Sequence, residues 1–184
     1  MTTAAETRTS GTAPALRRLY FVRFGFAVVW AGLLALTGSD LGVAAGVLLV
    51  LYPLFDVGAA AVDARSSRTR ELVLNMVFSA LAAVGLAVAA ASGIPAVLRV
   101  WGAWAVLAGA VQLVVALRRR RRRLGGQWPM ILSGGLSVLV GVSFITSAGK
   151  DDPSLTNLAG YAVVGGVFFL ISAIRLGPAA GGHE

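Results

Sequence analysis

Six runs of about 20 mostly apolar residues, separated by short polar connections, limit what this chain can fold into. A helix of this length spans the roughly 30 Å hydrocarbon core of a bilayer. It also satisfies its own backbone hydrogen bonds where water is absent. The sequence therefore predicts an all-α, polytopic membrane protein with six transmembrane helices, at residues 19–37, 41–63, 72–91, 95–117, 128–148 and 155–174.

The composition agrees with this class. Only 13% of the 184 residues are charged, whereas 57% are hydrophobic, and the mean hydropathy is +0.81. A soluble domain usually carries about 25% charged residues. We therefore place the chain in a membrane, and we expect Trp101, Trp104 and Trp128 to lie near the membrane–water interfaces, where such rings are common.

The reactive side chains argue against an enzyme. There is no cysteine, and the single histidine, His183, lies in a Gly- and Ala-rich segment near the C-terminus. A zinc site of the H-E-x-x-H type therefore lacks its ligands. Asp56 and Asp63 lie about 10 Å apart along one helix, too far to share a proton. We expect no catalytic residue, no cofactor and no metal.

The basic residues indicate an orientation. Arginines occupy alternate connections, and the other connections hold Asp40, the Ser92–Gly93 pair and the segment 149–153. Arginine-rich connections are typically cytoplasmic, which accounts for the net charge of +8 without a nucleic-acid partner. We predict a multi-pass protein of a bacterial plasma (inner) membrane with both termini inside. Its parts are a disordered cytoplasmic tail at 1–18, a six-helix transmembrane domain at 19–176 and a short cytoplasmic tail at 177–184.

The chain contains a weak internal repeat. When residues 102–118 are aligned with 159–175, Trp104 meets Tyr161, Gly109 meets Gly166, and both segments end in arginine. The second span also ends in arginine, at Arg65. The pattern predicts three hairpin repeats of the same orientation, rather than the inverted repeats of many transporters.

Small residues mark the expected contact faces of the helices. Gly42 and Gly46 form a G-x-x-x-G pair, and Ser133, Ser137 and Gly141 form a similar stripe. Such stripes let helices approach closely. They favour packing within the chain, and a homo-oligomer stays an open alternative.

The third hairpin contains the segments WPMILSGGLSVLVGVSFI at 128–145 and LAGYAVVGGVFFLISAIRL at 158–176. An aromatic residue precedes the glycine-rich first span, the connecting turn contains a proline, and the glycine-containing second span ends in a basic residue. This pattern resembles the HdeD-like family of small bacterial membrane proteins, which is linked with acid resistance. The resemblance implies a non-enzymatic membrane protein with a role in envelope or acid-stress tolerance. It implies no catalytic residues.

Asp56 is the most unusual residue, because a charge near the bilayer centre costs at least about 2.5–3.5 kcal/mol. Asp56 and Arg23 each lie about 6–7 Å from mid-membrane on the cytoplasmic side, in helices joined by a short connection. We therefore predict that they form an ion pair. The candidate buried polar site comprises Arg23, Tyr52, Asp56, Asn75 and Gln112.

Two interpretations of this site stay open. The polar side chains form either a structural network that fixes helix packing, or a carboxylate that titrates as protons or a small solute enter from the cytoplasm. The second interpretation corresponds to a small proton-linked transporter or channel.

The run of arginines after the fourth span is predicted to anchor that span at the cytoplasmic face. It is also the candidate contact for anionic lipid headgroups, where each basic residue contributes about 1 kcal/mol. These residues are Arg118, Arg119, Arg120, Arg121, Arg122 and Arg123.

Overall fold

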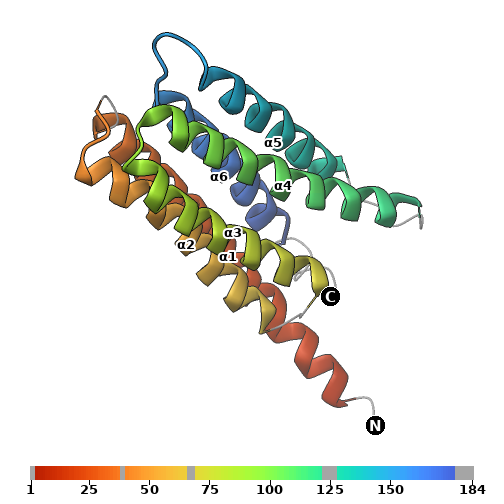
Figure 1. The fold of residues 1–184 in the computed structure, drawn as a ribbon. Helices are drawn as coiled ribbons and strands as arrows, with labels where there is room; N and C mark the ends of the chain where they lie inside the picture. The colour runs from red at the N-terminus through yellow and green to blue at the C-terminus, as the bar shows by residue number, and fades with distance from the viewer. Residues whose placement is uncertain (1–2, 38–39, 66–68, 122–127, 177–184) are drawn as a thin grey trace.

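The computed structural model describes residues 3–37, 40–65, 69–121 and 128–176 (Figure 1). This part of the chain forms six α-helices, each with a stretch long and apolar enough to cross a membrane. The predicted all-α, six-helix fold is therefore confirmed. The helices are α1 (Thr3–Thr37), α2 (Val43–Ala64), α3 (Arg70–Ala90), α4 (Ile94–Arg121), α5 (Trp128–Ser147) and α6 (Thr156–Leu176).

Two helices extend beyond their predicted spans. α1 begins at Thr3, within the segment predicted to be a disordered tail, although its membrane-length part is Pro14–Thr37. α4 continues through the start of the arginine run to Arg121. Apolarity sets only the part of a helix that fits a bilayer, and α4 can continue beyond that part because arginine favours helix about as well as leucine. Residues 177–184, the predicted second tail, lie outside the described residues.

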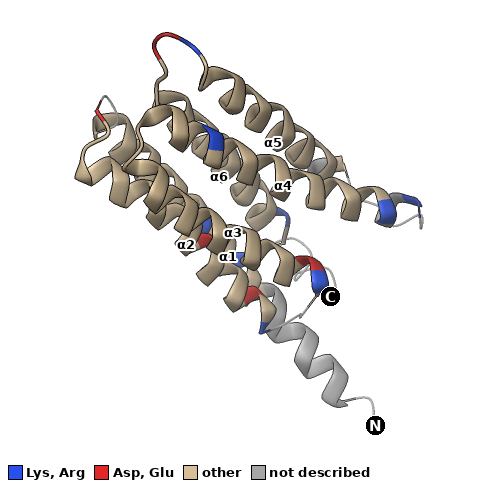
Figure 2. Ribbon diagram, in the orientation of Figure 1, with Lys and Arg blue, Asp and Glu red and all other residues tan. Residues whose placement is uncertain are grey.

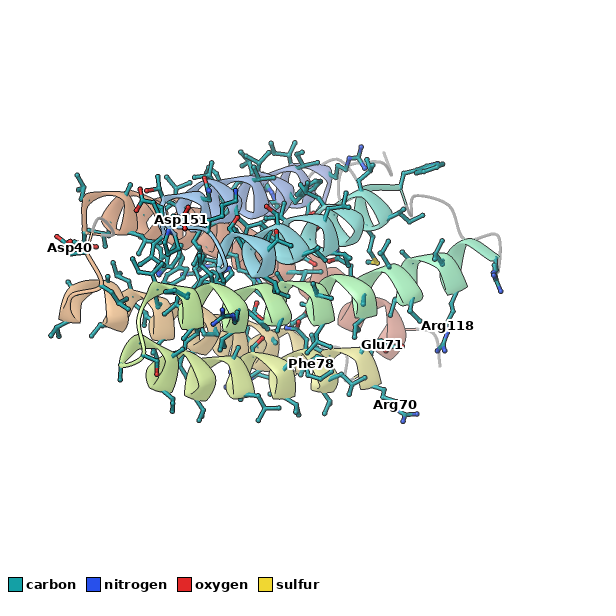
Figure 3. All side chains as sticks on the ribbon, turned by 45° about the horizontal axis from the view of Figure 1, so that its top comes forward. Asp40, Arg70, Glu71, Phe78, Arg118 and Asp151 are labelled. Atoms are coloured by element: carbon teal, nitrogen blue, oxygen red, sulfur yellow. The ribbon has the colours of Figure 1, made fainter. Side chains whose placement is uncertain are left out.

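The two ends of the bundle differ in charge. Arg70 and Arg118 lie at one end, called here the arginine end, together with Glu71 (Figure 3). Asp40 and Asp151 lie at the opposite end (Figure 3). Local signals support these boundaries: the Thr69 hydroxyl accepts from the amide of Leu72 at the start of α3. The tight turn from α3 to α4 uses Gly93 at φ +99°, a conformation that favours glycine.

The helices pack in an order that the hairpin repeat does not predict. The closest pairs are α4–α5, α1–α6 and α2–α3, whereas α3–α4 and α1–α2 contact each other less and α5–α6 least. Each close pair therefore joins two neighbouring hairpins instead of the two helices of one hairpin. The α1–α6 pair closes the six helices into a ring, and the neighbours in this ring that contact each other least are α5 and α6.

Glycines explain why α4 and α5 are the closest pair. A Cβ atom on Gly102 would lie 2.5 Å from the carbonyl oxygen of Gly141, and one on Gly109 would lie 2.6 Å from that of Gly134. The two backbones are thus in direct contact at two points, two turns apart. Ser137 of the predicted small-residue stripe lies at the same contact. This stripe therefore serves packing within the chain.

The core lies in the half of the bundle toward the opposite end. Trp30 of α1 and Trp101 of α4 are buried and stacked, and the rings of Tyr52 and Trp104 pack against them. We call these four residues the aromatic core. The rings of Trp101 and Trp104, predicted near an interface, turn inward and fill the space between α1, α2 and α4, in the half of α4 toward the opposite end. Trp128 is exposed at the start of α5.

Candidate functional site

Asp56 lies inside the bundle and accepts hydrogen bonds on both carboxylate oxygens. The guanidinium of Arg23 in α1 forms an ion pair and hydrogen bond with Oδ1. Oδ2 accepts from Nδ2 of Asn75 at 2.8 Å and from the hydroxyl of Ser79 at 2.8 Å, both in α3. Asp56 is only 8% exposed. A carboxylate in α2 thus links two other helices.

The positions of these residues along their helices explain the contact. Asn75 and Ser79 are one turn apart on α3 and therefore share a face, which lets both donate to one oxygen. α2 packs closely against α3 and also contacts α1, so that Asp56 can meet both helices. Most other charged residues in the described part of the chain lie at helix ends or in connections (Figure 2).

Two further contacts extend the site to α4 and α6. The indole Nε1 of Trp104 donates to the hydroxyl oxygen of Ser79 at 3.2 Å. The guanidinium carbon of Arg23 lies 4.2 Å from the centre of the Phe169 ring, a cation–π geometry. We call Arg23, Asp56, Asn75, Ser79 and Trp104 the Asp56 network. It joins α1, α2, α3 and α4 and shares Trp104 with the aromatic core, and its other members lie closer to the arginine end.

The arrangement balances the cost of burying charge. The Arg23 and Asp56 side chains are 15% and 11% exposed, and each lies against its counter-ion. A buried ion pair needs good geometry and further hydrogen bonds to offset desolvation. Asn75 and Ser79 supply these bonds to the carboxylate. The site is therefore a buried ion pair whose carboxylate also accepts hydrogen bonds from two polar side chains.

Two residues of the predicted site make other contacts. Tyr52 packs its ring against Phe26, Trp30, Trp101 and Trp104, and the side-chain donors to Asp56 in the described part of the chain are Arg23, Asn75 and Ser79. Tyr52 therefore belongs to the aromatic core. Gln112 is half-buried in α4, two turns beyond Trp104 toward the arginine end, and makes no hydrogen bond to Asp56.

Sequence reasoning missed Ser79, Trp104 and Phe169. A serine in an apolar helix is common and usually bonds to its own backbone, so Ser79 carried no signal by itself. Its spacing from Asn75 was the available clue, because residues four apart share a face. The roles of Trp104 and Phe169 depend on helix packing, which the sequence does not specify.

The predicted lipid contact lies at the arginine end. Arg118 and Arg121 are exposed on the last turns of α4, and Arg119 and Arg120 lie between them in the same helix. Arg122 and Arg123 are outside the described residues. Among the residues that the structure describes, no three His, Cys, Asp or Glu residues lie close enough to hold a metal ion.

The second and third hairpins each contain an equivalent hydrogen bond between their two helices. Trp104 of α4 donates to Ser79 of α3 at 3.2 Å, and Tyr161 of α6 donates its hydroxyl to Ser137 of α5 at 3.1 Å. Trp104 and Tyr161 are the residues that the internal alignment places together. The second helix of each of these hairpins thus donates from one aromatic position to a serine of the first.

One stretch of the chain matches a known protein family. Residues 75–146 match a family described as a short repeat of unknown function, DUF308, the family to which HdeD-like membrane proteins belong. No curated protein and no solved structure matches the chain. The matched stretch runs from α3 to the end of α5, so it contains Asn75, Ser79 and Trp104 but neither Arg23 nor Asp56.

Proposed function

We propose that this multi-pass membrane protein is a non-enzymatic protein of HdeD-like type that contributes to envelope or acid-stress tolerance. In this proposal, the Asp56 network is structural. The observation that carries this role is that donors from α1 and α3 occupy both oxygens of the Asp56 carboxylate. The match of residues 75–146 to DUF308 supports the proposed type. The stress role is proposed from the resemblance to HdeD-like proteins alone.

Acid survival tests the physiological part of this proposal. A bacterial host that expresses the chain should survive exposure to acid better than a host that expresses none. Arg23→Gln, which breaks the ion pair, should reduce the benefit. Asp151→Asn removes a charge from the exposed turn after α5 and should leave the benefit intact. Equal survival with and without the wild-type chain would refute the stress role.

We further propose that the membrane is a bacterial inner membrane and that the arginine end faces the cytoplasm, where Arg118 to Arg123 contact anionic headgroups. The positive-inside rule supports this orientation. The chain has no cysteine, so single substitutions report cleanly on sidedness. Lys150→Cys should react with an impermeant maleimide in intact cells, whereas Arg175→Cys should react only after lysis. The reverse pattern would overturn the orientation.

A second candidate function is a small proton-linked transporter or channel that uses Asp56. It is favoured by the position of a titratable carboxylate within a membrane-spanning helix, since such residues often mark proton or ion pathways. Proteoliposomes with an imposed pH gradient test it. Proton flux that is lost in Asp56→Asn and retained in Asp151→Asn would favour transport. Absence of flux in the wild type would favour the structural role.

A further inference from the structure

The open seam between α5 and α6 contains a groove. Its volume is about 710 Å³, within the range of about 300–1,000 Å³ that is usual for small-molecule sites. Leu136 and Val140 of α5 and Val164 of α6 line its walls. α5 and α6 are also the neighbouring helices that contact each other least, so the groove follows from the way the ring closes.

The polarity of the groove changes along its length. Ser143, Thr156 and Asn157 line the part nearest the opposite end, where α5 finishes and α6 starts. Toward mid-membrane the lining is apolar, apart from Tyr161, whose hydroxyl is already bonded to Ser137. None of the described lining residues is charged. An occupant must therefore have a polar end at the surface and an uncharged, apolar body inside the bilayer.

The depth of the groove corresponds to one leaflet. From Thr156 to Val164 the helix rises about 12 Å, and half of a hydrocarbon core is roughly 15 Å. Leu136 lies near the middle of α5, so the groove ends close to mid-membrane. A single acyl chain of the leaflet at the opposite end has this length and orientation.

The turn above the groove carries charges of both signs. Lys150, Asp151 and Asp152 are exposed between the end of α5 and the start of α6. The phosphate of a phospholipid bound in the groove would lie near the ammonium group of Lys150. The amino group of its headgroup would lie near the carboxylates of Asp151 and Asp152. A zwitterionic headgroup complements this set better than an anionic one, because two of the three charges are negative.

We propose that the groove between α5 and α6 is a binding site for one zwitterionic phospholipid of the leaflet at the opposite end. One acyl chain lies between Val140 and Val164, the glycerol region meets Thr156 and Asn157, and the headgroup meets the charged turn. This site is separate from the Asp56 network and from the arginines at the other end of the bundle. A lipid bound there would fill the space between α5 and α6, the neighbouring helices that contact each other least.

Gly160 allows the groove to be filled without disturbing helix packing. A Cβ atom on Gly160 meets nothing within 4 Å, and Gly160 itself lines the groove. Gly160→Leu therefore places a side chain where the acyl chain would lie. Gly32→Leu is the matched control, because Gly32 in α1 is also exposed and also faces open space. If Gly160→Leu is not monodisperse in detergent, Val164→Phe at the exposed wall replaces it.

Photo-crosslinking measures occupancy directly. The full chain is reconstituted in vesicles that contain phosphatidylethanolamine with a diazirine in its acyl chain, and labelled peptides are mapped by mass spectrometry. We expect labelling of 136–144 and 157–164 to fall about tenfold in Gly160→Leu, which corresponds to about 1.4 kcal/mol. It should be unchanged in Gly32→Leu. The smaller groove between α2 and α3, about 440 Å³ and lined by residues such as Val47 and Leu54, should be labelled equally in all variants.

Three outcomes would overturn the proposal. Equal labelling around the whole bundle, insensitive to Gly160→Leu, would mean that only bulk lipid fills the groove. Crosslinks from 157–164 to a second copy of the chain would make the seam an oligomer interface. Equal competition by unlabelled phosphatidylglycerol and phosphatidylethanolamine, unaltered in Asp151→Asn/Asp152→Asn, would remove the headgroup selectivity.

Discussion

α4 meets α5 through backbone contacts, whereas α1, α2 and α3 meet through the side chains of the Asp56 network. At the first contact, glycines bring backbone atoms together and leave no space for a Cβ atom. At the second, one carboxylate collects three donors from two neighbouring helices. Lipid is as apolar as the helices, so association in a bilayer depends on close packing and on polar contacts. This bundle uses each in a different place.

The α4–α5 contact and the Asp56 network should therefore be destabilised by opposite kinds of substitution. The α4–α5 contact has no room for added atoms, so substitution to a larger residue should damage it most. The Asp56 network has no spare donor for the carboxylate, so removal of an atom should damage it most. Substitutions of both kinds, measured as free energies of unfolding in mixed micelles, test this difference.

The largest effect is expected for Gly109→Leu. Its Cβ atom would lie 2.6 Å from the carbonyl oxygen of Gly134 and 2.8 Å from the Cβ of Ser137, and relief requires the helices to separate. Overpacking in a core costs about 1–3 kcal/mol, and more where the obstacle is backbone. We expect a loss of about 3 kcal/mol or more. Gly135→Leu is the control, because a Cβ atom there meets nothing within 4 Å. Equal losses in both variants would show that leucine itself is the cause.

The next largest effect is expected for Arg23→Gln. It leaves the Asp56 carboxylate without its counter-ion, and breaking a buried ion pair from one side costs about 3–5 kcal/mol. We expect about 3 kcal/mol, because the Arg23 and Asp56 side chains remain 15% and 11% exposed. Arg65→Gln, at an exposed position, should change the stability little.

Asp56→Asn and the double variant complete the thermodynamic cycle. Asp56→Asn keeps an acceptor for α3 but buries the charge of Arg23 alone, so it should also be destabilising. Arg23→Gln/Asp56→Asn should recover part of the loss, since no isolated charge remains. An Asp56→Asn variant as stable as the wild type would contradict the structural role and favour the transport function.

The ion pair and the six helices could be predicted, because both follow from the cost of placing polar groups in hydrocarbon. A charge at Asp56 requires a partner, and the lengths of the spans bring Arg23 to the same depth. The order of helix packing could not be predicted in this way. A glycine such as Gly109 shows that a helix has a contact face but does not identify α5 as the partner. The contacts of Tyr52 could not be predicted for a related reason: its spacing from Asp56 is right for a shared face, but the tryptophans of α1 and α4 pack against its ring.

A smaller effect is expected when single donors to Asp56 are removed. Ser79→Ala removes the bond to the carboxylate and leaves Nε1 of Trp104 without its acceptor, so we expect about 1.5 kcal/mol, near the upper end of measured interhelical polar contacts. Asn75→Ala removes one bond only and should cost about 0.6–1 kcal/mol. Ser172→Ala is a suitable control, because its hydroxyl bonds to the backbone of its own helix. A larger loss for Asn75→Ala than for Ser79→Ala would show that the contact with Trp104 contributes nothing.

The smallest effect is expected for Tyr161→Phe, which removes the hydroxyl bond between α6 and α5. The ring and its edge-on contact with Phe144 are retained, so the loss should be about 0.6 kcal/mol, the average for such bonds in membranes. Because α5 and α6 have few other contacts, this bond should affect the opening of the seam more than the unfolding of the bundle. A spin-label pair on Ser143→Cys and Gly160→Cys should report a wider distance distribution in Tyr161→Phe than in the tyrosine background. An unchanged distribution would mean that the seam is held apart by the packing of α4 on α5 and of α1 on α6 alone.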